Sequence, residues 1–140
     1  MPPPEGSAVR GIDHVGLAVQ SLDDAVAFYV EELGMSLDGD RVALDGLDTE
    51  VQFLRAGTSK VELLCPTTRA GALPRFLEKR GEGLHHVCYE LADIHGAVER
   101  LTDRGVRMID AKPWRSPHGW VAYLHPAAAH GCAIELREHY

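Results

Sequence analysis

Apolar and polar residues alternate along two stretches of the chain, as they do in strands that are buried on one side. The first stretch covers residues 11–19 and the second covers residues 83–91. Each contains a histidine at the same place, His14 in the first and His86 in the second, 72 positions apart (86 − 14). In both stretches the histidine lies on the strand face opposite the apolar residues. This match indicates an internal duplication of the chain.

A helical pattern follows each of these strands, with apolar residues three and four positions apart. The expected helices begin at the capping residues Ser21 and Asp93. Later in each half a strand carries one glutamate, Glu62 in the first half and Glu135 in the second, 73 positions apart (135 − 62). The apolar neighbours place each glutamate on the opposite strand face. The chain is therefore predicted to be a duplicated module with one histidine and one glutamate per copy.

The predicted fold class is α+β, with two tandem βαβββ modules that share one curved mixed sheet around a metal cleft. A chain of 140 residues suits one domain, and no linker long enough to separate two free-standing domains is present. Within this domain we expect a flexible leader, a first module, a linker with a short helix and a second module. These four segments cover residues 1–9, 10–66, 67–82 and 83–140.

The four repeated polar residues form a plausible ligand set of two imidazoles and two carboxylates for a divalent metal ion. Imidazole suits zinc, cobalt, nickel or iron, and carboxylate oxygens also accept manganese or magnesium. The alternative is a set of polar residues on a solvent-facing side of the sheet. A single histidine would favour that alternative, whereas a matched set of four favours the metal site. The set is His14, Glu62, His86 and Glu135.

Composition narrows the remaining classes of protein. The formal net charge of −7 argues against a general nucleic-acid binder, which needs a basic face. The three cysteines, Cys65, Cys88 and Cys132, have no CxxC spacing and fit a reducing cytoplasm better than a disulfide framework. No apolar run approaches the length of a membrane span, and the first residues do not resemble a signal peptide. We therefore expect a cytoplasmic protein without membrane or nucleic-acid partners.

Several short motifs resemble those of a known family. The motifs are IDHVG at 12–16, ELLCP at 62–66, FLEKRGEGLHH at 76–86, LHP at 124–126 and IEL at 134–136. The duplicated module resembles the vicinal oxygen chelate superfamily, which includes glyoxalase I, extradiol dioxygenases and drug-resistance binders. Within it, the motifs are similar to those of methylmalonyl-CoA epimerases. The resemblance covers nearly the whole chain from about residue 10.

The resemblance implies an enzyme that inverts the 2-carbon of methylmalonyl-CoA or a related acyl-CoA through a metal-stabilised enolate. It implies that His14, Glu62, His86 and Glu135 bind a divalent ion, expected to be cobalt, manganese, zinc or nickel. It also implies that Glu135 is one catalytic base. Some members carry a second glutamate on the strand before the Glu62 strand, and Glu50 is the nearest candidate for this second base here. The alternative is an exposed glutamate at the strand end, because a one-residue change of register reverses its face. The expected assembly is a homodimer.

Other members of the superfamily provide the alternatives. A glyoxalase I-type lactoylglutathione lyase would use the same four ligands, but its usual Asp-Pro turn is replaced here by His125-Pro126. An extradiol dioxygenase needs two histidines and one glutamate and commonly has a longer chain. A non-catalytic small-molecule binder of the same fold has no need of four ligands. The chain departs from the epimerase pattern at residues 127–129, which are alanines where lysine is common, and in a bulkier loop at residues 114–119.

Overall fold

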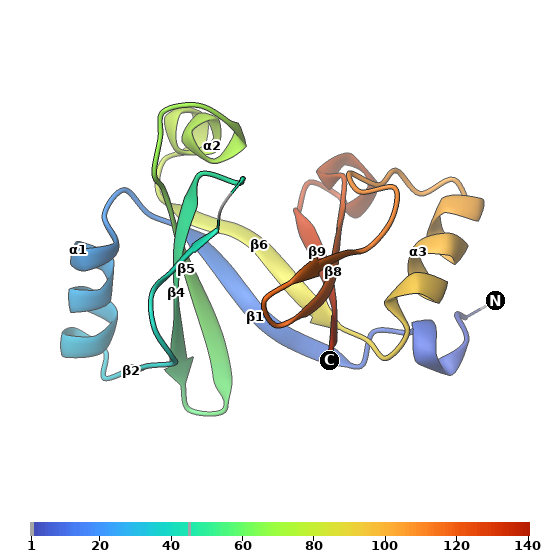
Figure 1. Cartoon of the computed structure of the whole chain (residues 1–140), viewed down its shortest axis with the longest axis horizontal. Helices are drawn as coiled ribbons and strands as arrows, with labels where there is room; N and C mark the ends of the chain where they lie inside the picture. Colours follow the sequence, from blue (N-terminus) through green and yellow to red (C-terminus); the bar gives the residue numbers. More distant parts are fainter. Residues whose placement is uncertain (1, 45) are drawn as a thin grey trace. The chain divides into compact units, whose positions relative to one another are not determined.

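The computed structural model describes residues 2–44 and 46–140 (Figure 1). They divide into two compact units, each built around strands and flanking helices. The contiguous unit is His14–His85, and the split unit joins the residues up to Asp13 to His86–Tyr140. Two strands, β1 (Gly11–Ala18) and β6 (Gly83–Glu90), begin in one unit and end in the other.

The contiguous unit contains a sheet whose strand order is β2-β4-β5-β1, with β3 also paired to β4. The strands β1 and β5 are parallel, whereas the pairs β4–β5, β3–β4 and β2–β4 are antiparallel. The bounds of these strands are β2 (Ser36–Leu37), β3 (Val42–Leu44), β4 (Thr49–Ala56) and β5 (Ser59–Pro66). The apolar patterns at residues 41–44, 50–54 and 60–64 predict three strands, which match β3, β4 and β5, whereas no pattern predicts β2.

The first helix of the contiguous unit has the length that its sequence pattern predicts but changes its type part-way along. The α-helix α1 (Leu22–Val26) is capped by Ser21, whose hydroxyl accepts a hydrogen bond from the Asp24 N–H at 3.2 Å. A π-helical segment, η2 (Ala27–Glu32), continues it, so the helix expected over residues 21–33 is present, and its second half is wound as a π-helix. In a π-helix the hydrogen-bonded residues are five positions apart instead of four. The spacing of apolar residues in the sequence does not predict this change of helix type.

Both faces of the contiguous sheet pack against apolar side chains. One face packs against α1, and its buried members are Val19, Leu22, Leu54, Val61 and Leu63. The other face packs against α2 (Ala72–Arg80), and its buried members are Ala18, Val51, Leu64, Leu73 and Leu77. The helix α2 matches the short helix predicted in the linker. Residues two apart on each strand thus belong to the same cluster, as strand geometry requires.

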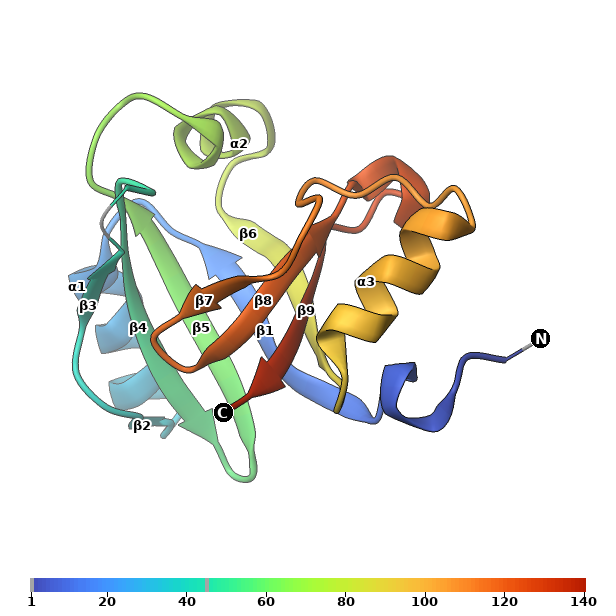
Figure 2. The same ribbon diagram turned by 45° about the vertical axis from the view of Figure 1, so that its right-hand side comes forward.

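The split unit contains the strand order β6-β9-β8-β7, in which β6 and β9 are parallel and the other pairs are antiparallel (Figure 2). The elements are α3 (Ile94–Asp103), β7 (Trp114–Ser116), β8 (Gly119–Leu124), η3 (Pro126–Ala129) and β9 (Ile134–His139). The helix α3 packs on one face of β8 and β9, around a core that includes Leu91, Ile94, Val98 and Leu136. The strand β7 lies within the segment predicted to be a loop.

The segment predicted as a flexible leader forms contacts within the split unit. A single 3-10 turn, η1 (Glu5–Ser7), lies against α3, and the Asp93 N–H donates to the Gly6 carbonyl at 2.7 Å. The Arg10 N–H likewise donates to the Glu90 carbonyl at 2.9 Å. In the described part of the chain, no helix is long and apolar enough to cross a membrane.

Candidate metal-binding pairs

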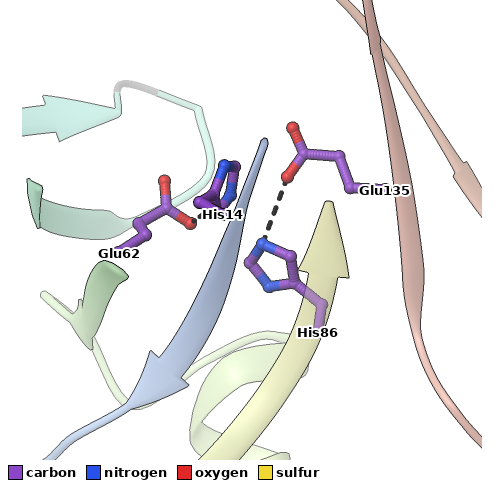
Figure 3. Close-up of side chains that lie close together, drawn as sticks. All are labelled: His14, Glu62, His86 and Glu135. Atoms are coloured by element: carbon purple, nitrogen blue, oxygen red, sulfur yellow. Dashed lines mark ion pairs between the residues drawn. The ribbon is translucent and has the colours of Figure 1, made fainter. Parts of the chain in front are cut away.

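The contiguous unit brings His14 and Glu62 together. Because Gly16 of β1 is in register with Glu62 of β5, His14, two residues earlier, projects from the same sheet face. Both residues are buried, and His14 Nε2 lies 3.6 Å from a carboxylate oxygen, Glu62 Oε1 (Figure 3). Phe53 is the register partner of Glu62 on β4, and its ring contacts the His14 ring edge-to-face at 5.2 Å.

The split unit brings His86 and Glu135 together in the same way. Cys88 of β6 is in register with Glu135 of β9, and His86 lies two residues before Cys88 on the same face. Both members of the pair are 2 % exposed, and His86 Nε2 lies 3.2 Å from Glu135 Oε1 (Figure 3). In each pair an imidazole nitrogen therefore faces a carboxylate oxygen, and both groups are buried.

Two further polar side chains surround Glu135. Tyr123, its register partner on β8, donates a hydrogen bond from its hydroxyl to Oε1 at 3.0 Å. Arg137 donates from Nη2 to Oε2 at 2.9 Å. Burial alone would lower the pKa of the Arg137 guanidinium, but the charge of Glu135 and its hydrogen bond outweigh burial and raise it.

Sequence reasoning missed both of these residues. Arg137 could have been found, because it lies two positions after Glu135 on a strand and so must share its face. Tyr123 carries no such signal, since its proximity depends on how β8 and β9 align.

Glu50, the candidate second base, lies on the other side of the contiguous sheet. It is in register with Cys65, whereas Glu62 is in register with Phe53, three residues further along β4. Odd-numbered β4 residues thus share the face of Glu62, and Glu50 shares the face covered by α1. Burial raises the pKa of the Cys65 thiol, and the nearby charge of Glu50 adds to that rise. The expectation that Glu50 faces the ligands is therefore wrong by one residue.

Thr49, the residue before Glu50 on β4, lies on the sheet face that carries Glu62. It is buried, and its hydroxyl donates to the Leu47 carbonyl at 2.9 Å. A threonine hydroxyl that donates to a backbone carbonyl cannot accept a proton near neutral pH as a carboxylate can.

Two other histidines have structural partners. The His85 ring contacts Phe76 of α2, with the ring centroids 4.8 Å apart. His139, expected to be a surface residue, is half-buried and pairs with Asp13. Neither arrangement adds a ligand to the two His–Glu pairs.

The donor set of the two pairs fits a divalent cation. All four residues are buried, and each offers one nitrogen or oxygen ligand atom. A buried carboxylate needs a compensating charge, which a metal ion supplies. Imidazole nitrogen together with carboxylate oxygen suits first-row transition ions and zinc.

Comparisons with known proteins identify the family. The model of the Glyoxalase/Bleomycin resistance protein/Dioxygenase superfamily matches residues 13–123. The ethylmalonyl-CoA/methylmalonyl-CoA epimerase of Cereibacter sphaeroides is 35% identical over 130 residues, which cover 91% of this chain and 96% of that protein. The chain belongs to this superfamily.

Solved structures agree with this assignment. The methylmalonyl-CoA epimerase of Mycobacterium tuberculosis has a TM-score of 0.87 and 30% identity, covering 94% of this chain and 89% of that one. A variant of the Streptomyces coelicolor methylmalonyl-CoA epimerase in complex with 2-nitronate-propionyl-CoA has a TM-score of 0.86 and 29% identity, covering 94% and 99%. The predicted family and its α+β vicinal oxygen chelate fold are confirmed.

Proposed function

We propose that this chain is a metal-dependent epimerase that inverts the 2-carbon of methylmalonyl-CoA or a close 2-substituted malonyl-CoA. The observation that carries the proposal is the pair of buried His–Glu contacts at matched positions of the duplicated chain. The names of the relatives support the substrate class, because epimerases of this kind match over nine-tenths of the chain.

The metal would be held by both pairs, His14 with Glu62 and His86 with Glu135. The donor chemistry supports cobalt, manganese, zinc or nickel as the ion. When bound, such an ion acts as a Lewis acid that stabilises negative charge on substrate oxygens. The four side chains would contribute two neutral and two anionic ligands, which leaves a divalent centre electrically balanced before an anionic substrate arrives.

Glu135 would act as the base that removes the proton from the 2-carbon. That C–H bond breaks with its electron pair delocalised into the adjacent thioester, and inversion requires a proton to return on the other face. Because Glu50 faces α1, it does not support a second carboxylate base in this protein. We therefore assign the returning proton to water, with Glu135 as the carboxylate base.

The remaining expectations complete the proposal. An acyl-CoA is the substrate partner, and the protein acts in the cytoplasm, where its three free cysteines stay reduced. We also propose a homodimer. Large apolar side chains that are more than half exposed in the contiguous unit, Phe28, Leu33 and Leu37, support a surface that a second copy covers.

Solvent isotope exchange tests the reaction. One epimer of methylmalonyl-CoA, incubated with protein and Co²⁺ in D₂O, is expected to racemise with deuterium entering at the 2-carbon. Chelated protein serves as the control and should leave the epimer unchanged. Isomerisation of the methylglyoxal–glutathione adduct, with the acyl-CoA untouched, would instead establish the glyoxalase I-type alternative.

A further inference from the structure

The two carboxylate oxygens of Glu135 have different partners. Oε1 faces His86 Nε2 at 3.2 Å and accepts the Tyr123 hydroxyl at 3.0 Å. Oε2 accepts the Arg137 guanidinium at 2.9 Å. The carboxylate is therefore held at both ends in a defined orientation.

Arg137 is an unusual residue for its position. It is only 6 % exposed, and burying a guanidinium is costly unless a charge compensates for it. Its buried Nε has no hydrogen-bond partner among the described residues. The ion pair with Glu135 is therefore the interaction that compensates for burying the guanidinium charge.

The other copy of the repeat shows that strand packing does not require a cation there. The residue two positions after Glu62 is Leu64, an apolar member of the cluster against α2. Arg137 occupies the equivalent position after Glu135. A departure from the repeat, placed directly on the proposed base, indicates a role in orienting that base.

We propose that Arg137 is a positioning residue for Glu135. It holds Oε2, prevents the carboxylate from rotating, and keeps Oε1 directed to the side of His86. The proposal rests on the proposed function, in which Glu135 is both ligand and base. Residues that orient ligands in this way commonly change metal affinity or activity by about 10–100-fold when mutated.

Two substitutions and a matched control test this role. Arg137→Gln removes the cation, Arg137→Lys keeps a positive donor without the planar fork, and Arg107→Gln changes an exposed arginine of the same unit. Arg137→Gln is expected to lower kcat for deuterium exchange about 10–100-fold with KM unchanged. It should also shift the visible absorption of the Co²⁺-loaded protein, because Glu135 becomes able to reorient. Arg137→Lys should recover most of the rate, and Arg107→Gln should match the wild type in both measurements.

The outcomes separate the two proposals. An unchanged kcat and an unchanged Co²⁺ spectrum in Arg137→Gln would overturn the positioning role. If Arg137→Gln does not fold, Arg137→Lys decides alone: a small loss in kcat at constant KM supports the role, whereas a raised KM at constant kcat, or no change in either, contradicts it. If the wild type shows no exchange at all, the proposed function fails, and the Co²⁺ spectra recorded without substrate still test Arg137.

Discussion

The two copies of the repeat hold their His–Glu pairs in the same way but surround them differently. In the contiguous unit the register partner of Glu62 is Phe53, and in the split unit the register partner of Glu135 is Tyr123. Each ring lies edge-to-face against the histidine of its pair, and the distance between ring centroids is 5.2 Å for Phe53 and 6.0 Å for Tyr123. Two residues beyond each glutamate, the first copy has Leu64 and the second has Arg137.

We relate this difference to the two tasks of the proposed site, which are to bind a metal and to transfer a proton. The features common to both copies are one imidazole and one carboxylate, the groups that a metal needs. Beside Glu135 the second copy places a hydroxyl, from Tyr123, and a guanidinium, from Arg137, groups that orient a carboxylate through hydrogen bonds. On the proposed function, the duplicated module would supply ligands twice, and the second copy would add the groups that orient a catalytic base.

The largest expected effect comes from removing either histidine. If both pairs hold a single ion, His14→Ala and His86→Ala should each abolish metal binding after chelation and reconstitution, because each removes a ligand from the same set. Metal content per chain, measured by mass spectrometry, checks this. Two ions per wild-type chain, with one lost in each variant, would show instead that the pairs act separately.

A second comparison exchanges the glutamates. Glu135→Gln should lower the rate of deuterium exchange by about 10²–10⁴-fold, since an amide cannot accept the proton. Glu62→Gln should keep most of the rate, because the amide carbonyl oxygen still serves as a ligand. Exchange kinetics at saturating Co²⁺ distinguish the two variants. Equal losses in both would contradict the assignment of the base to the split unit.

The smallest expected effect comes from the two aromatic register partners. Tyr123→Phe removes one hydrogen bond to Glu135 and should cost about 1 kcal/mol of unfolding free energy. If the same bond orients the base in the transition state, kcat should fall by about fivefold. Chemical denaturation and exchange kinetics measure these losses. Phe53→Leu is the matched control, expected to leave the proton-transfer step unchanged; a fall in its kcat as large as that of Tyr123→Phe would contradict the comparison.

Features set by periodicity within one strand could be predicted from the sequence, whereas features set by alignment between strands could not. Alternation within a single strand predicts the sheet face on which His14 and His86 each lie, and the repeat gives the same prediction twice. The face of Glu50 depends on the register of its strand, which the sequence does not determine, and a shift of one residue reverses every side chain. The π-helical turn after Val26 has no counterpart in apolar spacing, so it too was not foreseen.

The placement of the first residues in the split unit has a consequence for the order of folding. Asp13 pairs with His139, which lies 126 positions later in the chain. The contiguous unit, in contrast, consists of the single continuous segment His14–His85. During synthesis, which proceeds at about 5–20 residues per second, the contiguous unit is complete before the strand that carries Glu135 emerges from the ribosome. The first residues must wait for partners in the second half of the chain, because Gly6 and Arg10 pair with Asp93 and Glu90, and Asp13 pairs with His139. A nascent chain halted once residue 85 has emerged from the ribosome should therefore protect the Glu62 strand from proteolysis and leave the first residues open to cleavage.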